Sequence, residues 1–436
     1  MAAPDVAPTE GVFSLLDTDL YKLTMQSAVL KYFPSTHVTY SFTNRTADMK
    51  LSREAYDWLH TQVSKLADVA ITPDELAYLR TACPFLSEPY LTYLATFRFK
   101  PAEQIRLFFT AEHDTGGPDD RGNIELHTKG LWLETILYEI PLLALTSEAY
   151  FKFCDRDWDH AGQTERAHQK GRALLKAGCQ ADREAQAAGW TGRITGTSNV
   201  HFAMRFGVPP IGTVAHEWFM GVAAVTEDYT CATEIALRYW IGTFGRGVLA
   251  IALTDTFGTP TFLSAFKKPI EAAEPGGESF ADVFTGVRQD SGDPIEFVKL
   301  MRHFYGSIDA ASSSSAEQKK RTIVFSDSLN VERCIELRGV ADSLGFASSF
   351  GVGTFFTNDF TTLSSRGAEK SAPLNIVIKL SSADGKPAIK ISDNLGKNTG
   401  DSETVRQVKK ELGYVENEWA GVDEKQRWGN GWGGPG

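Results

Sequence analysis

Cysteine is scarce in this chain of 436 residues, and the cysteines that are present form no recognisable pattern. They show no CxxC pair and no regular spacing: Cys83, Cys154, Cys179, Cys231 and Cys334. Secreted disulfide scaffolds and structural zinc sites both need such a pattern. We therefore expect reduced thiols and a location in the cytoplasm, with the nucleus as a further compartment.

Long apolar runs are also absent. No run approaches the roughly 18 residues that would cross a membrane, and the start, MAAPDVAPTEG, has neither a basic nor an apolar signal region. The net charge of −11 argues against nucleic acid and against an anionic membrane as partners. A chain of this length with 42% hydrophobic residues can fold as two to three domains.

Two common catalytic motifs are missing. No GxxxxGK[ST] loop occurs, so ATP cannot be held by a standard P-loop. His216-Glu217 is not followed by the second histidine of a HExxH zinc site, and no other histidine lies at ligand spacing from it. We therefore expect no zinc and no resident metal at this histidine.

The stretch 191–221 organises the rest of the chain. Asn199 can cap a short helix that Gly207 ends, and the prolines at 209 and 210 stop that helix from continuing. His216 then falls after a strand-like run and at the start of the next helical pattern, where unpaired backbone donors favour an anion. A phosphoryl group on the ring would suit this position, and a hydrogen-bonded structural histidine is the alternative.

A regular alternation of strands and helices follows, between residues 193 and 354. Six strand-like runs end in small polar or acidic residues: ITGTSN (194–199), IGTVAH (211–216), VLAIALTD (248–255), FTGVRQD (284–290), TIVFSD (322–327) and SSFGVGT (348–354). Helical patterns lie between them, which favours a parallel α/β arrangement with polar groups at the carboxyl ends of the strands. Elsewhere we expect helices at 15–32, 51–81, 128–138 and 147–178, and strands at 38–43, 97–99, 105–110, 375–380 and 388–392.

Acidic and glycine residues at these strand ends are candidates for a shared site. Asp255, Asp290 and Asp327 recur at about one βα unit, and the latter two could hold ribose hydroxyls or Mg²⁺. Arg288 lies two residues before Asp290, so both can point the same way to meet a carboxylate or phosphate. Each acid could instead be a turn former, and Arg288 could simply pair with Asp290.

Several longer motifs occur in a fixed order along the chain. They are LLDTDLYKLTMQ (15–26), YSFTNR (40–45), LTSEAYFKF (145–153), GTSN (196–199), PIGTVAHEW (210–218), ALTDTF (252–257), VRQDSGDP (287–294), FSDSLN (325–330), FGVGTFFTND (350–359) and KISDNLGK (390–397). With these motifs the chain closely resembles the nicotinate phosphoribosyltransferases over nearly its whole length.

The resemblance implies an α/β fold, an irregular βα barrel with a smaller α+β domain built from both terminal segments. The expected division is a disordered lead at 1–10, an N-terminal part at 11–145, the barrel at 146–370, a returning segment at 371–420 and a mobile tail at 421–436. It also implies an enzyme of NAD salvage that joins nicotinate to phosphoribosyl pyrophosphate, with coupled ATP hydrolysis, Mg²⁺ and a homodimer.

Site roles follow from the matched motifs. The resemblance implies that His216 is transiently phosphorylated and that Asp255 holds its ring. It further implies substrate contacts by Tyr21, Thr213, Arg288, Asp290, Asp327, Gly353 and Thr354. Within this set, Tyr21 stacks on the pyridine ring of the neighbouring subunit's substrate, and Asp290 faces the ribose. Lys390 and Lys397 would assist with the pyrophosphate.

One departure from the family leaves alternatives open. The family carries a Phe-Gly-x-Arg-Arg strand and a helix before GTSN, whereas residues 177–196 lack that motif and are too few for both elements. One barrel strand is therefore expected to be missing, and a catalytically impaired homologue that dimerises or binds nucleotide is one alternative. A nicotinamide-using relative is another, although that enzyme has an acid where this chain has Ser198.

Overall fold

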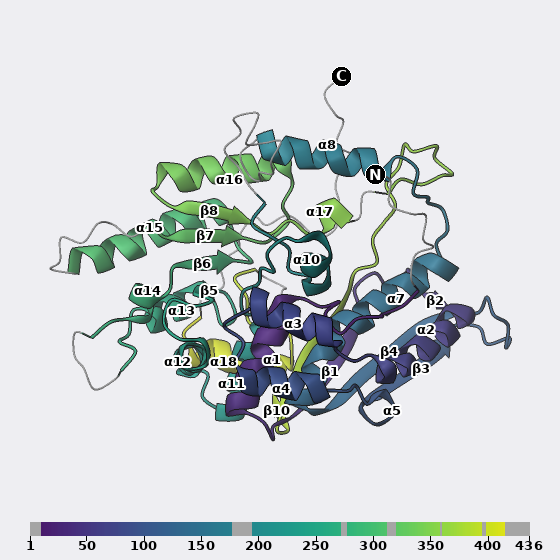
Figure 1. Ribbon diagram of the computed structural model, residues 1–436, viewed down its shortest axis with the longest axis horizontal. Coiled ribbons are helices and arrows are strands. Elements are labelled where there is room, and N and C mark those ends of the chain that lie inside the picture. Colours follow the sequence, from purple (N-terminus) through teal and green to yellow (C-terminus); the bar gives the residue numbers. More distant parts are fainter. Residues whose placement is uncertain are drawn as a thin grey trace. The chain divides into compact units, whose positions relative to one another are not determined.

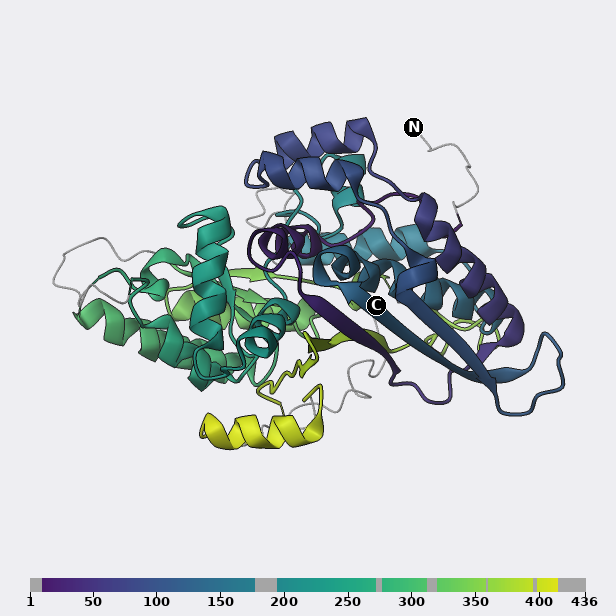
Figure 2. The same ribbon diagram turned by 90° about the horizontal axis from the view of Figure 1, so that it is seen from below.

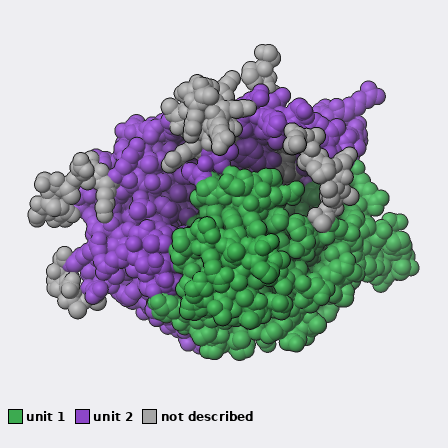
Figure 3. Space-filling view, viewed as in Figure 1, with its two compact units in different colours: residues 1–156, 196–212, 374–379 green, residues 157–195, 213–373, 380–436 purple. Residues whose placement is uncertain are grey.

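The computed structural model describes residues 10–176, 194–271, 277–311, 320–357, 360–394 and 398–414. It divides into two compact units (Figure 3). The first unit comprises residues 1–156, 196–212 and 374–379, and the second comprises 157–195, 213–373 and 380–436. Residues 196–212 thus belong to the first unit, although they fall within the range expected for the barrel.

The first unit contains most of the N-terminal helices. They are α1 (Leu20–Tyr32), α2 (Arg53–Lys65), η1 (Leu66–Asp68), α3 (Pro73–Ala82), α4 (Glu88–Thr96), α5 (Pro101–Gln104), α6 (Trp132–Thr135), η2 (Ile136–Tyr138), α7 (Glu139–Phe153) and α10 (Val200–Phe206). As predicted, Asn199 caps α10 by accepting from the Phe202 N–H, and Gly207 ends it in the left-handed conformation. Helix α1 begins later than predicted, after Asp19.

An antiparallel sheet completes this unit (Figure 2). Its strands are β1 (His37–Asn44), β2 (Leu51–Ser52), β3 (Ile105–Ala111), β4 (Arg121–Leu131) and β9 (Ile376–Ala383), which continues into the second unit and pairs there with β10 (Lys386–Pro387). The eleven-residue β4 was not expected, and its end overlaps the helix predicted at 128–138. Pairing with both β1 and β3 outweighs the weak apolar pattern of this strand.

The second unit is built on a parallel sheet in the order β5-β6-β7-β8 (Figure 1). These strands are β5 (Ile251–Leu253), β6 (Gly286–Gln289), β7 (Thr322–Phe325) and β8 (Ala347–Phe350). Their helices are α8 (Gln163–Lys176), α11 (His216–Thr226), α12 (Ala232–Phe244), α13 (Thr259–Phe266), α14 (Phe280–Val283), α15 (Pro294–Ala311), α16 (Val331–Ser343), α17 (Thr354–Thr357) and α18 (Ser402–Glu411). The last four predicted strand runs are therefore confirmed, and the α/β class with them.

The first two predicted runs do not become strands of this sheet. In the first unit, Thr197 and Pro210 form only an isolated parallel bridge. Among the described residues the parallel sheet therefore has four strands, and its closure into the expected barrel stays a prediction. The long helix predicted at 147–178 is likewise two helices, because residues 154–162 are rich in aspartate and end at Gly162 with a φ of 72°.

Other sequence predictions concern cysteines and membranes. The four cysteines in the described ranges form no disulfide, as expected. Within those ranges, no helix combines the length and the apolar character required to cross a membrane.

Gly286, the first residue of β6, controls how closely this strand approaches β7. A Cβ atom there would lie 2.1 Å from the backbone oxygen of Thr322. Gly286→Ala should therefore lower the free energy of unfolding by about 1–3 kcal/mol, as overpacking does. Gly306→Ala in α15, where a Cβ meets nothing within 4 Å, is the control and should raise it by about 0.5–1 kcal/mol. Equal denaturation midpoints for the two variants would contradict this prediction.

Candidate active site

His216 lies at the first position of helix α11, as the sequence predicted. The residue before it, Ala215, has an extended backbone (φ −105°, ψ 166°) and offers no side chain to cap the helix. The first backbone N–H groups of α11 therefore have no side-chain cap at that position, and they favour negative charge there. The His216 side chain is 14% exposed, so most of its surface is covered by the protein.

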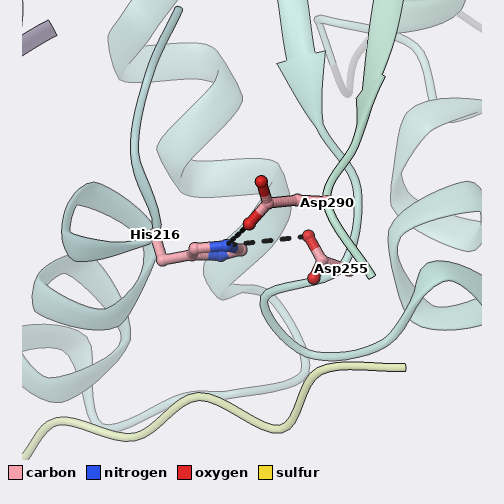
Figure 4. A group of neighbouring side chains, drawn as sticks. All are labelled: His216, Asp255 and Asp290. Atoms are coloured by element: carbon pink, nitrogen blue, oxygen red, sulfur yellow. Dashed lines mark hydrogen bonds and ion pairs between the residues drawn. The ribbon is translucent and has the colours of Figure 1, made fainter. Parts of the chain in front are cut away.

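Two carboxylates, those of Asp255 and Asp290, face the His216 ring (Figure 4), and the hydroxyl of Thr256 contacts its other nitrogen. Its Nε2 atom lies 3.0 Å from Asp290 Oδ2 and 3.8 Å from Asp255 Oδ1, and its Nδ1 atom lies 3.0 Å from Thr256 Oγ1. Asp255 and Thr256 follow β5 after one residue, and Asp290 directly follows β6. Because β5 and β6 are adjacent and parallel, their carboxyl ends bring these residues together.

The acid within hydrogen-bonding distance of the ring is Asp290, whereas the resemblance assigned this position to Asp255. Fully buried Asp255 instead accepts a hydrogen bond from Ser291 Oγ, 2.5 Å from its Oδ2 atom. Its Oδ1 atom is buried without a hydrogen-bond partner and faces the ring. Asp255 thus contributes charge at close range, and Asp290 contributes the directional contact.

Arg288 is fixed beside this cluster by three contacts. Its Nη2 atom donates to Asp290 Oδ1 at 2.8 Å, its Nε to Ser326 Oγ at 2.8 Å and its Nη1 to Thr213 Oγ1 at 3.2 Å. Ser326 Oγ also lies 2.8 Å from Asp290 Oδ1. The expected residues Thr213, Arg288 and Asp290 therefore form one network with His216, and the possible Arg288–Asp290 pair is present.

Lys390 joins the cluster from the C-terminal part of the chain. Its Nζ atom lies 2.8 Å from His216 Nε2, 3.3 Å from Asp255 Oδ2 and 3.9 Å from Asp290 Oδ2. The side chain is 12% exposed. The resemblance had linked Lys390 and Lys397 to the pyrophosphate, and Lys397 lies outside the described residues. Residues 177–193 of the segment that departs from the family, 177–196, also lie outside them.

Burial and charge act in opposite directions on His216. Burial lowers the pKa of the ring and the Lys390 ammonium lowers it further, while Asp255 and Asp290 raise it; the net pKa lies below its usual value. The ring is therefore mainly neutral near pH 7 and has one unprotonated nitrogen.

The two acids remain ionised. Burial raises the pKa of Asp290, but the charges of Arg288, His216 and Lys390 outweigh burial and hold that pKa well below its usual range. Lys390 and His216 likewise lower the pKa of Asp255 against the effect of its burial. Both carboxylates can therefore stabilise positive charge that develops on the ring.

The same three residues could in principle bind a metal ion. Ligand atoms of His216, Asp255 and Asp290 lie within 4.8 Å of one another. The Lys390 ammonium, however, is within 4 Å of one ligand atom of each, so a cationic side chain already takes the place of a metal. This arrangement does not fit a resident ion while Lys390 is present.

The remaining predicted residues belong to other elements of the fold. Asp327 follows β7, and Gly353 and Thr354 follow β8, with Thr354 opening the short helix α17. Tyr21 is the second residue of α1, in the first unit. Their assigned substrate contacts stay predictions.

Four polar residues of this network were missed. Thr256, Ser291 and Ser326 each adjoin an aspartate that had been singled out, so the motifs TDTF, RQDS and FSD contained the signal. Asp393 accepts hydrogen bonds from the N–H and hydroxyl of Thr259 at 2.9 and 2.6 Å. Burial and the nearby Asp255 charge raise the pKa of Asp393 to about 6.

Comparisons with known proteins agree on one family. Residues 173–416 match the model of the "Nicotinate phosphoribosyltransferase (NAPRTase) family", and residues 16–147 match the model of its N-terminal domain. The nicotinate phosphoribosyltransferase of Saccharomyces cerevisiae is 43% identical, with 95% of this chain and 98% of that protein covered. That of Methanosarcina mazei is 35% identical, with 90% and 96% covered. A crystal structure of the Saccharomyces cerevisiae homologue superimposes with a TM-score of 0.82 at 42% identity, covering 93% of this chain and all of that one.

Proposed function

The chain belongs to the nicotinate phosphoribosyltransferase family, and from this premise we propose that it works through a phosphohistidine formed at His216 with ATP as co-substrate. As a member of that family it joins nicotinate and phosphoribosyl pyrophosphate, giving nicotinate mononucleotide and pyrophosphate. The observation that carries the phosphohistidine is the His216 ring, set at a helix N-terminus between two ionised carboxylates.

The contacts of the ring determine which nitrogen attacks. In the tautomer in which ionised Asp290 accepts from Nε2–H, the lone pair is on Nδ1, beside Thr256 Oγ1. A phosphoryl group on Nε2 would instead face two carboxylates, 3.0 and 3.8 Å from that atom. The Nδ1 lone pair therefore attacks the γ-phosphorus of ATP, the bond to the β,γ-bridging oxygen breaks, and ADP leaves with the bonding electrons.

The same contacts support the product of that step. The phosphorylated ring keeps its Nε2 proton and carries a delocalised positive charge, which Asp290 and Asp255 stabilise. Water then attacks the phosphorus, the N–P bond breaks, and inorganic phosphate leaves. The uncapped N-terminus of α11 favours the phosphate charge while it is present.

Arg288 is the group we assign to the nicotinate carboxylate. Its guanidinium is held in one orientation by Asp290, Ser326 and Thr213, so little side-chain entropy is lost on binding. The pyridine nitrogen attacks C1 of the phosphoribosyl group as pyrophosphate leaves. The phosphate oxygens of the pyrophosphate-bearing substrate would hold Mg²⁺, which would neutralise part of their charge. We assign Tyr21 of the partner subunit to the face of the pyridine ring, in a homodimer located in the cytoplasm.

Similarity to curated enzymes over 90–95% of the chain favours an active enzyme over an impaired homologue. The direct test is formation of nicotinate mononucleotide and pyrophosphate from nicotinate and phosphoribosyl pyrophosphate, with and without ATP. ATP should increase turnover and be hydrolysed alongside it. Turnover that is indifferent to ATP would exclude the coupled mechanism.

Nicotinate should be used in preference to nicotinamide. The nicotinate carboxylate gains a charge-assisted hydrogen bond with Arg288, which contributes about 1.5–3 kcal/mol to binding. At position 198 the chain has a serine, so no carboxylate is present there to accept a hydrogen bond from the amide of nicotinamide. We expect kcat/KM to favour nicotinate by about tenfold to a hundredfold when both compete. Ser198→Asp is the matched variant and should narrow this ratio. Equal use of both by the unaltered chain would contradict the assignment.

A further inference from the structure

One ring nitrogen of His216 has two partners that cannot both bond to it at once. The Lys390 ammonium, a donor only, lies 2.8 Å from Nε2, and the Asp290 carboxylate, an acceptor only when ionised, lies 3.0 Å from the same atom. A protonated Nε2 donates to Asp290, and an unprotonated Nε2 accepts from Lys390. The two contacts therefore belong to different ring tautomers.

Each competing group has another partner if it loses the ring. Asp290 Oδ1 is bonded to Arg288 Nη2 at 2.8 Å, and Lys390 Nζ lies 3.3 Å from Asp255 Oδ2. At the opposite nitrogen, the Thr256 hydroxyl can accept from Nδ1–H or donate to an unprotonated Nδ1. Neither tautomer leaves a ring nitrogen without a suitable partner, so the choice depends on Lys390.

The backbone around Lys390 is fixed, so only its side chain is expected to move. Ile391 N–H donates to the Thr256 carbonyl at 2.8 Å, and Lys390 itself exchanges two backbone bonds of 3.0 Å with Thr399. Three residues further on, Asp393 accepts from Thr259. These bonds hold the segment against the residues that follow β5.

We propose, on the basis of the phosphohistidine function above, that Lys390 is a positioning residue that selects the tautomer of His216. While the ammonium donates to Nε2, Nδ1 carries the proton and has no lone pair for attack. When Lys390 turns to Asp255 or to an incoming phosphate, Nε2 takes up a proton from water and then donates a hydrogen bond to Asp290, while Nδ1 releases its proton to water. The ring gains and loses one proton, and Nδ1 becomes the nucleophile.

The device restrains His216 until an anion is bound. Phosphate oxygens attract the ammonium more strongly than a neutral ring does, so a phosphate-bearing substrate releases Nε2. Within the described part of the chain, the charged groups that face the ring are Asp255, Asp290 and Lys390, with Arg288 bonded to Asp290. Of these groups, Lys390 is the hydrogen-bond donor that lies within bonding distance of the ring.

The test measures the tautomer directly in the full chain. Protein with ¹⁵N-labelled histidine contains nine histidines, and His216→Ala identifies the signal of interest by its loss. The wild type without substrate should show the Nδ1–H form, and Lys390→Met should show the Nε2–H form with a higher His216 pKa. Lys390→Arg keeps a donor and should retain the wild-type form, as should the control Lys386→Met on β10.

A functional measurement accompanies the spectra. Without phosphoribosyl pyrophosphate, Lys390→Met should acquire label from γ-labelled ATP about tenfold faster or more than the wild type, as expected from removing one hydrogen bond to a charged group. A lysine that merely binds pyrophosphate would leave this rate and the tautomer unchanged, and that result would overturn the inference.

Failure of the inference can be separated from failure of the phosphohistidine mechanism. If no variant is labelled, the mechanism is wrong, while the tautomer still decides the role of Lys390. If Lys390→Met does not fold, the tautomer is measured instead in wild-type protein saturated with inorganic pyrophosphate. Binding of the pyrophosphate is followed by ³¹P spectra. The Nε2–H form should then appear, and persistence of the Nδ1–H form would refute the proposed switch.

Discussion

Replacing His216 with alanine should abolish the phosphoryl label that ATP leaves on the chain, while the protein stays folded. Alanine removes both ring nitrogens, so no N–P bond can form. Incubation with γ-labelled ATP should give the wild type an acid-labile, base-stable label and give His216→Ala none. His303→Ala, which alters an exposed histidine of α15 in the same unit, should label like the wild type.

The effect on turnover should differ from the effect on labelling. Phosphoribosyl transfer does not itself pass through the ring, so His216→Ala should keep a slow reaction that ATP no longer accelerates. The stability should change little, because Lys390 still lies within 4 Å of both Asp255 and Asp290 and balances part of their charge. Equal labelling of His216→Ala and wild type would show that phosphate is carried elsewhere.

Sequence reasoning succeeded where strand ends determine position. Asp255 and Asp290 follow apolar runs that form adjacent parallel strands, so their meeting at one edge was predictable without coordinates. His216 was equally predictable, because the prolines at 209 and 210 end one helical pattern and a new one begins at the histidine.

The details that the sequence did not indicate depend on long-range contacts. Asp290 lies within hydrogen-bonding distance of the ring, whereas Asp255 is contacted at Oδ2 by Ser291 and Lys390. Lys390 is 174 residues from His216, and no periodicity in the sequence indicates such a contact. Strand β4 was not predicted for a similar reason, because its pairing with β1 and β3 outweighs its local sequence pattern.

Arg288→Ala is expected to impair substrate binding and stability together. Its guanidinium is the largest favourable influence that keeps the pKa of Asp290 low, and the side chains of the pair are only 22% and 20% exposed. Removing it should cost nicotinate binding about 1.5–3 kcal/mol, or roughly tenfold to a hundredfold in affinity. The substitution should also lower the free energy of unfolding, because the largely buried Asp290 carboxylate then lacks the positive charge of Arg288 that stabilises it.

The pH dependence identifies the source of the lost stability. A carboxylate whose folded-state pKa is depressed stabilises the fold above its unfolded value of about 3.9, and this contribution is lost as pH falls through the folded-state pKa. Because the pKa of Asp290 lies well below its usual range, wild type and Arg288→Ala should differ most at neutral pH. The difference between their unfolding free energies should begin to shrink as pH falls below about 4, and it should continue to shrink down to the folded-state pKa of Asp290.

Arg288→Lys separates the two roles of the arginine. Lysine keeps a positive charge near Asp290 but loses the planar fork that contacts Asp290, Ser326 and Thr213 together. We expect it to recover most of the stability and little of the nicotinate affinity, measured by chemical denaturation and by calorimetric titration. Arg302→Ala, at an exposed arginine of α15, should change neither quantity. If Arg288→Ala loses stability yet binds nicotinate as well as the wild type, Arg288 belongs to the scaffold, and another cation must receive the carboxylate.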